Sequence, residues 1–347
     1  MWETWTVCKC YLQLKKNIAN LSLVQVTLAK NLEFTRSVTV RCVAPIANIN
    51  DFREDCMTAQ LTRPDLRPNF RPTPTSEIER PPIDWVTLGF FAVFHGVALL
   101  APWFFSWSAL GVAILLHWLC GGVGICLGFH RMLSHRSFQA PRWLEYPIAF
   151  LGTLAMQGGP IFWVSGHRKH HAFTEDVQDD PYSAKRGFWW SHILWIVFPQ
   201  RDNFDKTRYS KYAPDLVRQP FYRFLNNYFL LFQVPLALLL YAIGGWSFVI
   251  YGVFVRAVFL WHATWLVNSA THTWGYRNFD AKDNARNLWW VSLLTYGEGW
   301  HNNHHTYPRA AQTGWKWWEI DVTWYTILLF ERLGWAKKVK RIPHQAR

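Results

Sequence analysis

Histidine is the residue type in this sequence whose number and spacing most clearly indicate chemistry. The chain has 14 histidines, and most fall in three short clusters or at one position that follows Asn268. The nine are His130, His135, His167, His170, His171, His272, His301, His304 and His305. Neutral imidazole suits zinc, copper, iron or nickel, and nine imidazoles exceed what one ion can bind. The pattern therefore predicts a site for two metal ions.

The spacing within the clusters indicates how the imidazoles are presented. Two clusters read His-x-x-His-His, beginning at His167 and at His301. Residues at i, i+3 and i+4 share one face of a helix, so the members of each triplet can converge on one site. His130 and His135 are five residues apart, which is about 140° around a regular helix. They converge only if the helix ends or bends between them, and otherwise they serve different metals.

The number of histidines also distinguishes between kinds of metal chemistry. A zinc hydrolase needs about three protein ligands and an open water position, and the His-Glu-x-x-His motif is absent. Copper transport favours thiolates and thioethers, yet the chain has only four methionines. A di-iron site that activates oxygen needs many nitrogen or oxygen ligands and external electrons. The residues therefore favour oxygen-activating iron.

Four apolar stretches must position these histidines, and each is long enough for a membrane-spanning helix. They run from about Trp85 to Phe105, Ala109 to Phe129, Tyr228 to Ile243, and Trp246 to Val267. Very short links, at residues 106–108 and 244–245, predict two tight helical hairpins. Each histidine cluster lies at or beyond the end of a span, where an apolar lipid tail can enter between the helices. The alternative is four buried core helices of a soluble protein.

The basic residues predict the orientation in the membrane. The net charge is +13, and only 17% of residues are charged, against about 25% in soluble domains. Lysine and arginine are spread through the segments outside the spans, which argues against a nucleic-acid partner. Neither hairpin link carries one, so both termini and the central loop are expected on the cytoplasmic side. Arg256 lies within the fourth span and should face the bundle interior or reach the interface.

The remaining segments are expected to be peripheral. Residues 144–163 and 188–198 are interpreted as helices that lie at the membrane interface or pack over the hairpins. The first 83 residues form an N-terminal extension with a proline-rich linker over 62–82, and residues 84–347 form the membrane domain. Residues 1–56 are either an organelle transit peptide or lie upstream of a true start at Met57.

The histidine clusters resemble those of the membrane fatty acid desaturases. The matching segments are GFHRMLSHRSF, GHRKHH, NSATH and GEGWHNNHH, within a likeness that covers Ile83 to Lys340. The branch most similar is the stearoyl-type Δ9 desaturases of cyanobacteria and plastids, with their acyl-CoA relatives. The resemblance implies an all-α membrane protein, with four transmembrane helices in two hairpins and a cytosolic-side helical cap that holds two irons. The nine histidines listed above are the implied ligands, Asn268 acts through water, and Asp180 and Glu298 orient imidazoles.

The implied reaction forms a cis double bond in a saturated acyl chain with O2 as co-substrate. No nucleotide-binding motif is visible, so two electrons come from ferredoxin or cytochrome b5, as in the family. Acyl-CoA-using animal members carry Arg-Asp before the second histidine cluster, whereas Ser165 and Gly166 stand here. This favours a glycerolipid-linked chain over acyl-CoA. The active site is expected on the cytoplasmic or stromal side. The alternatives are a di-iron membrane hydroxylase, a metal transporter and a membrane zinc hydrolase.

Overall fold

The computed structural model describes residues 25–26, 40–41, 82–198 and 211–343. The chain divides into two compact units, Met1–Glu77 and Ile78–Arg347. In the first unit, strands β1 (Gln25–Val26) and β2 (Val40–Arg41) pair in antiparallel fashion. The expected N-terminal extension, with its transit peptide or later start, lies almost entirely outside the described residues.

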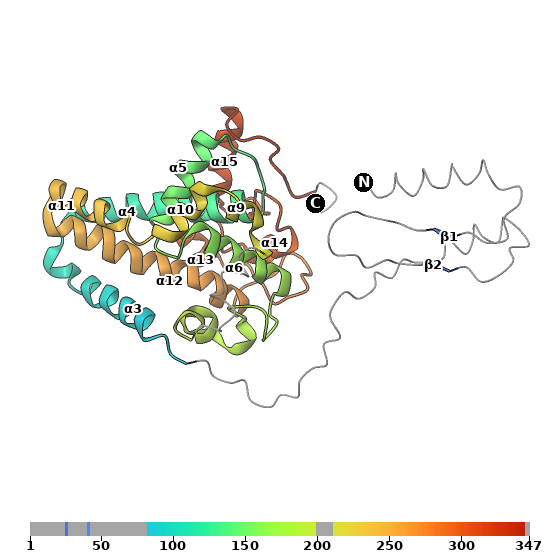
Figure 1. Ribbon diagram of the computed structural model, residues 1–347, viewed down its shortest axis with the longest axis horizontal. Coiled ribbons are helices and arrows are strands. Elements are labelled where there is room, and N and C mark those ends of the chain that lie inside the picture. Colours follow the sequence, from blue (N-terminus) through green and yellow to red (C-terminus); the bar gives the residue numbers. More distant parts are fainter. Residues whose placement is uncertain (1–24, 27–39, 42–81, 199–210, 344–347) are drawn as a thin grey trace, which may run out of the picture. The chain divides into compact units, whose positions relative to one another are not determined.

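The described part of the second unit is built from helices, as Figure 1 shows. The α-helices are α3 (Trp85–Ala98), α4 (Trp107–His117), α5 (Arg142–Thr153), α6 (Pro160–Phe173), α7 (Trp195–Val197), α9 (Pro214–Val217), α10 (Pro220–Tyr228), α11 (Gln233–Val249), α12 (Arg256–Ser269), α13 (Trp289–Leu294), α14 (His301–Thr306) and α15 (Val322–Arg332). The π-helices are η2 (Trp118–Ser134), η4 (Trp190–Leu194) and η6 (Ile250–Val255). The 3₁₀-helices are η1 (Ala101–Phe104), η3 (Ala184–Arg186) and η7 (Ala270–His272).

Local sequence explains where the first two long helices begin. The Asp84 carboxylate accepts hydrogen bonds from the amides of Val86 and Thr87, at 3.0 and 3.1 Å. The Ser106 hydroxyl accepts one from the Ala109 amide at 3.1 Å. Both side chains therefore satisfy amides that the first turn leaves unpaired. The second cap lies within the short link predicted at residues 106–108, and α4 begins there at Trp107.

Two helical stretches are long and apolar enough to cross a membrane. They are Trp107–Ser134, which joins α4 to η2, and Gln233–His272, which joins α11, η6, α12 and η7. Helix α3 is apolar but has only 14 residues. The surfaces of the long stretches carry exposed aliphatic side chains, such as Ile114 at 61% and Leu238 at 65% exposure. Such surfaces suit lipid, because apolar side chains gain nothing from facing water.

The second long stretch reverses direction near its start. Its 40 residues would extend about 60 Å as one straight helix, twice the thickness of a bilayer core. Gly244 and Gly245 have non-helical backbone angles, and Gly245 has φ +61°. A Cβ on Gly252 would lie 2.7 Å from Cδ1 of Leu240. The arms on either side of the glycine pair therefore pack against each other, as α11 and α12 do in Figure 1.

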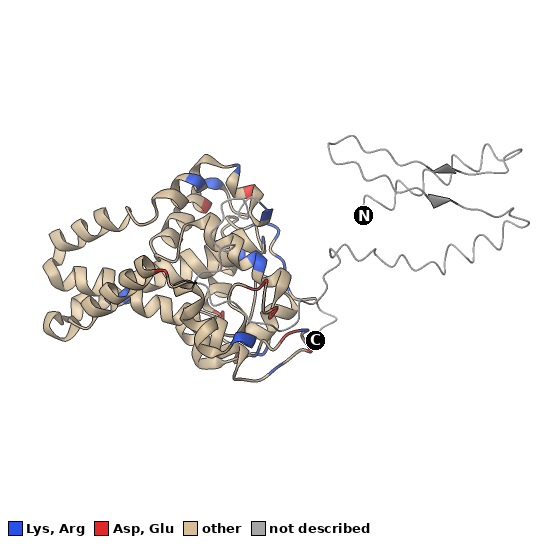
Figure 2. Ribbon diagram, turned by 60° about the horizontal axis from the view of Figure 1, so that its bottom comes forward, with Lys and Arg blue, Asp and Glu red and all other residues tan. Residues whose placement is uncertain are grey.

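Charge is concentrated at one end of the second unit. In Figure 2 the helix ends on the left of the second unit are tan, and most blue and red segments lie toward its right. Arg256 is the exception expected from the sequence, and it is only 1% exposed. Its guanidinium donates to the carbonyls of Gly252 and Leu154 and to Oε1 of Gln233. The prediction that this charge faces the bundle interior is confirmed.

A close helix contact supports the histidine-bearing segments. Gly124 on η2 lies against Gly152 on α5, where a Cβ would come within 2.3 Å of the Gly152 amide nitrogen. Only glycine allows two backbones to approach so closely. The apolar stretch at 144–163 is therefore two helices, α5 and the start of α6, which are separated by residues 154–159.

Candidate metal centre

The structure brings all nine predicted histidines together in two groups. One group has five members, His130, His135, His167, His171 and His304. The other has four members, His170, His272, His301 and His305. Within each group, the candidate ligand nitrogens all lie within 4.8 Å of one another. We refer to these groups as the five-histidine cluster and the four-histidine cluster.

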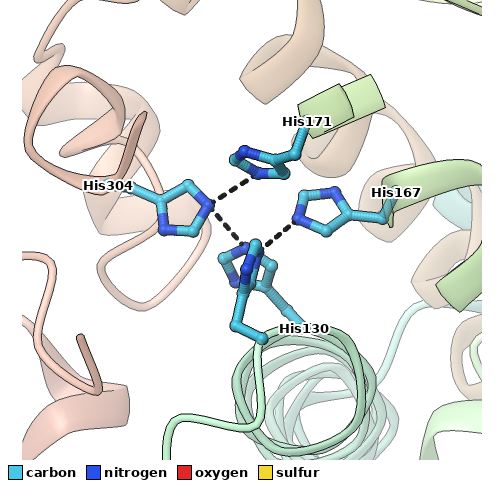
Figure 3. Close-up of side chains that lie close together, drawn as sticks. His130, His167, His171 and His304 are labelled. Atoms are coloured by element: carbon cyan, nitrogen blue, oxygen red, sulfur yellow. Dashed lines mark hydrogen bonds between the residues drawn. The ribbon is translucent and has the colours of Figure 1, made fainter. Parts of the chain in front are cut away.

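Ring nitrogens face one another across the five-histidine cluster, as Figure 3 shows. Nε2 of His304 lies 3.1 Å from Nε2 of His130 and 3.0 Å from Nε2 of His171. Nε2 of His135 lies 2.7 Å from Nε2 of His167. Each of these nitrogens is a lone-pair donor when its ring carries the proton on Nδ1. Five lone pairs that point into one small volume form a donor set suited to a metal ion.

A π-helix explains how His130 and His135 reach the same cluster. The His135 amide donates to the His130 carbonyl at 3.1 Å, a bond between residues five apart. In a π-helix this i→i+5 bond places such residues one above the other. The helix η2 then ends at Ser134. The sequence required either a bend or an end between the two histidines, and the structure has the end, after Ser134.

The two His-x-x-His-His triplets each supply both clusters. On α6, His167 and His171 belong to the five-histidine cluster, whereas His170 belongs to the other. On α14, His304 belongs to the five-histidine cluster, whereas His301 and His305 belong to the other. The triplets share a helix face as expected, but this face lies between two adjacent sites. The division into five and four depends on helix orientation, which spacing alone does not determine.

Two carboxylates that the sequence indicated contact imidazole Nδ1 atoms. Asp180 accepts from Nδ1 of His170 at 2.9 Å and is fully buried. Oε2 of Glu298 lies 2.9 Å from Nδ1 of His130. A carboxylate at Nδ1 holds the proton there and leaves the Nε2 lone pair for a metal.

Two further carboxylates, which the sequence did not indicate, also contact imidazole Nδ1 atoms. Glu175 contacts Nδ1 of His272 at 3.1 Å, and Asp283 contacts Nδ1 of His305 at 2.7 Å. Glu175 also accepts from the amide of Asn284. The Glu175–His272 pair is 97 residues apart in the chain, and neither acid stands at helical spacing from its histidine. No local pattern could have identified them.

The four-histidine cluster fits a cation by a second criterion. Nε2 of every member is buried and lacks a hydrogen-bond partner. These are the Nε2 atoms of His170, His272, His301 and His305. An unpaired buried polar atom normally costs about 1–3 kcal/mol. Four such atoms that converge on one point are explained by an ion that satisfies all of them together.

Burial keeps most of the imidazoles in the form that binds metal. It lowers the pKa of His135 and His167 well below the usual value, and neighbouring imidazoles lower it further. The same causes lower the pKa of four other members, His171, His301, His304 and His305. Neutral rings with free lone pairs are therefore favoured at physiological pH.

A buried ion network anchors Glu298 beside His130. Nε of Arg131 donates to Glu298 at 3.0 Å, and Nη1 of Arg131 donates to Asp321 at 2.9 Å. Burial opposes ionisation of Glu298, but Arg131 and His130 outweigh it and hold its pKa below the usual value. Glu298 is therefore held as an ionised carboxylate beside the His130 ring. The network also ties η2 to the segment that precedes α15.

Two cavities that share lining residues lie beside the clusters. The larger has a volume of about 690 Å³ and is lined by residues of α3, α6, α10 and α12. The smaller, about 50 Å³, is lined by His130, His170 and His301 among others. Asn268 and His167 line both cavities. The two cavities therefore adjoin each other beside the histidine clusters.

Comparison with known proteins decides the family. The family model described as "Fatty acid desaturase" matches residues 102–327. The chain belongs to the fatty acid desaturase family. It is thus an oxidoreductase of lipid metabolism, and the resemblance inferred from the histidine clusters is confirmed. The alternatives of a transporter and a zinc hydrolase are set aside.

Three cyanobacterial relatives are especially similar to this desaturase. An sn-2 palmitoyl-lipid 9-desaturase of Nostoc sp. (strain 36) is 67% identical over 76% of this chain and 93% of its own. An sn-1 stearoyl-lipid 9-desaturase of Anabaena variabilis is 52% identical, over 75% of this chain and 95% of its own. An sn-1 stearoyl-lipid 9-desaturase of Synechocystis sp. is 50% identical, over 84% of this chain and 87% of its own.

The desaturase has other histidines that the clusters do not use. His95, His117, His192 and His262 lie outside both clusters, as the sequence analysis assumed by leaving them out of the ligand set. His344 lies outside the described residues.

Proposed function

We propose that this desaturase introduces a cis Δ9 double bond into a saturated acyl chain that is esterified to a glycerolipid. The observation that carries the proposal is the similarity, at 50–67% identity, to three proteins named as lipid 9-desaturases. The cavity supports the same substrate. Its volume of about 690 Å³ exceeds that of an extended acyl chain of 16 to 18 carbons.

Two iron ions are the metals that we propose for the clusters. Five imidazoles would hold one ion, and four imidazoles with water on Asn268 would hold the other. Bound iron supplies the activation of O2 that removes hydrogen from unactivated methylenes. The protein contributes neutral nitrogen donors, carboxylates that fix their tautomers, and burial that excludes bulk water.

The side chains between the two cavities would orient the acyl chain. Nε1 of Trp163 donates to Gln157 at 3.1 Å, and Nε2 of Gln157 donates to Thr264 at 2.8 Å. All three line the larger cavity, and Trp163 and Thr264 also line the smaller one. The bonded triad makes a rigid wall beside His167. Such a wall fixes which carbons stand nearest the metals, and this positioning determines where the double bond forms.

The proposed preference for a glycerolipid head group rests on residues 165 and 166, where acyl-CoA-using animal desaturases carry Arg-Asp. Ser165 and Gly166 both line the larger cavity. A Cβ at Gly166 would meet nothing within 4 Å. This part of the wall therefore offers space rather than an arginine–aspartate pair. A neutral glycerolipid ester fits such a wall better than the charged acyl-CoA head group.

We further propose four membrane spans, with both termini and the metal centre on the cytoplasmic or stromal side. Helix α3, the 107–134 helix, and the two arms around Gly244–Gly245 would be the spans. The charged end seen in Figure 2 would face the aqueous side. Ferredoxin or cytochrome b5 would deliver the electrons there, because an acidic carrier is attracted to a basic surface.

Expression in a host that lacks Δ9 monoenes tests this proposal. The double-bond position is measured in each separated lipid class after a short pulse of labelled acetate. We expect Δ9 monoenes that appear first in glycerolipids. Early labelling of acyl-CoA monoenes would contradict the acyl carrier, another double-bond position would contradict Δ9, and hydroxy acids would contradict desaturation.

A further inference from the structure

Three exposed cations gather beside the five-histidine cluster. Arg136 directly follows His135, and its side chain is 59% exposed. Arg309 and Lys340 are exposed as well. Burial lowers the pKa of Lys340, and the charges of Arg309 and Arg136 lower it further. The three positive charges therefore lie within electrostatic reach of one another, and we call these three residues the cation cluster.

Hydrogen bonds between distant parts of the chain hold the cation cluster together. The Lys340 amide donates to the Ser137 carbonyl at 2.8 Å, and the Ala311 amide donates to the Lys340 carbonyl at 2.8 Å. Nζ of Lys340 also donates to the Arg136 carbonyl at 2.7 Å. The segments that carry the three cations thus stay side by side, although Arg136 and Lys340 are 204 positions apart.

The positive charge of these segments is not balanced by acids of their own. Residues 134–140, 306–313 and 336–341 hold six lysines and arginines and no aspartate or glutamate. Asp215 contacts Arg136, but it is shared with Arg168. Like charges that are brought together repel one another. The fold opposes this repulsion with backbone hydrogen bonds, and the result is a surface that attracts an acidic partner.

The segments that contact the four-histidine cluster have a different charge. They are residues 174–186, which supply Glu175, and residues 276–286, which supply Asp283. Together they hold five basic and six acidic residues. An acidic protein is therefore attracted to the metal centre from the side of His135 rather than from the side of these segments.

We propose that the cation cluster is the docking site of an acidic protein that carries one electron at a time. This inference rests on the proposed function. Desaturation takes two hydrogens from the acyl chain, and the reduction of O2 to two waters also needs two electrons and two protons. Each docked carrier gives up one electron and leaves oxidised, so two carriers dock in turn for each double bond. Docking at Arg136 keeps the electron path short, because His135 is the next residue in the chain.

Reversal of one charge tests the docking site without altering a histidine. Arg309→Glu is compared with Lys282→Glu, which changes an exposed cation beside Asp283 by the same charge. The association of ferredoxin with protein in neutral-lipid nanodiscs is measured at low ionic strength. We expect the association rate to fall about 10-fold in Arg309→Glu and to remain at the wild-type value in Lys282→Glu. Arg309→Lys should also bind as the wild type does. An equal loss in the two reversals, or a loss in Lys282→Glu alone, would overturn the proposal.

Turnover measurements separate docking from the chemical step. The KM for reduced ferredoxin should rise in Arg309→Glu, whereas the monoene formed in one turnover of chemically reduced protein should equal that of the wild type. Added salt should slow association with the wild type and remove most of its advantage over Arg309→Glu. The same measurements with cytochrome b5 cover the second carrier, and failure of both carriers to bind the wild type would overturn the docking site.

One further result distinguishes a carrier from a lipid surface. Unchanged binding of both carriers to Arg309→Glu, together with a loss of co-purified phosphatidylglycerol, would show that the cation cluster contacts lipid head groups and would overturn the proposal. Carrier binding that depends on Arg309 but yields no acyl product would instead overturn only the proposed function.

Discussion

At the scale of single residues, the metal centre depends on which ring nitrogen of each histidine carries the proton. Asp180, Glu175 and Asp283 each contact an Nδ1 atom, and in each case the Nε2 atom of the same ring is buried and unpaired. A carboxylate at Nδ1 fixes the tautomer and makes the ring a better ligand. These acids should therefore control metal affinity although none of them belongs to a metal cluster.

Replacing Glu175 tests this role directly. Glu175→Gln keeps the shape of the side chain but removes the charge that holds the proton on Nδ1 of His272. We expect metal affinity at the four-histidine cluster to fall about 10- to 100-fold. Iron content after dialysis against a graded chelator series measures the change.

Glu331→Gln is the matched control, because Glu331 pairs with Arg341 at the surface. It should retain iron as the wild type does. Equal retention of iron by both variants would show that Glu175 has no influence on the metal.

At the scale of elements, an ion cluster holds the second histidine helix to the end of the first. Arg168 on α6 donates to both carboxylate oxygens of Asp215 on α9, at 2.7 and 3.0 Å. It also donates to the carbonyls of Leu133 and Ser134, immediately before His135. Arg136 contacts Asp215 from the other side at 2.7 Å. We call these contacts of Arg168, Arg136 and Asp215 the clamp. The clamp fixes the position of His135 relative to the α6 histidines.

The clamp should make stability depend on acid pH. Burial opposes ionisation of Asp215, but Arg168 and Arg136 outweigh it and lower its pKa to about 2. The stability that ionised Asp215 contributes is therefore complete above pH ~4, which is the usual pKa of aspartate in an unfolded chain. This stability is lost as the pH falls toward 2. Because the group is partly exposed, we expect about 1 kcal/mol.

Thermal unfolding followed by tryptophan fluorescence measures this effect. Asp215→Asn should lower Tm at pH 7, and the difference from the wild type should shrink below pH 4. The control Asp280→Asn removes a fully exposed partner of Arg277 and should leave Tm unchanged. A difference for Asp215→Asn that stays constant down to pH 2 would contradict the assignment.

Helix packing at the smaller cavity should set the length of the preferred acyl chain. Gly121 lines this cavity, and a Cβ there would lie 2.6 Å from Cδ1 of Leu260, which also lines it. Gly121→Ala should displace Leu260 and reduce the space beyond the metals. We expect the ratio of 16- to 18-carbon products to rise several-fold in lipid extracts.

Gly89→Ala on α3 is the matched control, since a Cβ there meets nothing within 4 Å. Its product ratio should equal that of the wild type. An unchanged ratio in active Gly121→Ala would place the end of the acyl chain elsewhere.

The elements show what could be inferred from sequence and what could not. The expected span from Ala109 to Phe129 forms the middle of a helix that continues to Ser134. Sequence reasoning ended it early because His130 and Arg131 are polar. Arg131 is in fact 1% exposed, since Glu298 and Asp321 neutralise it from segments more than 160 residues away.

As with the helices, the sequence predicted part of the candidate site and left part of it open. Eight of the nine histidines could be named because they stand in short local clusters, and His272 because the family resemblance indicated it. The division between clusters could not, because it depends on how α6 and α14 face each other. Glu175 and Asp283 were missed because the fold alone brings them to His272 and His305.

At the scale of the whole molecule, the separation of apolar and charged ends predicts a membrane topology. In a variant that lacks the six native cysteines, single cysteines at Ser108 and Lys337 report the two sides. Both positions are exposed. A membrane-impermeant maleimide added outside intact cells should label Ser108→Cys, and Lys337→Cys only after the membrane is opened. Labelling of both from the same side would contradict the four-span proposal.

The central claim is that nine histidines form two adjacent iron sites, and metal analysis of purified protein tests it most directly. We expect two irons per chain in the wild type, and about one in His301→Ala, because the five-histidine cluster remains intact. His301→Ala should also produce no monoene while inserting into the membrane normally. A single zinc in the wild type, or two irons and full activity in His301→Ala, would contradict the account.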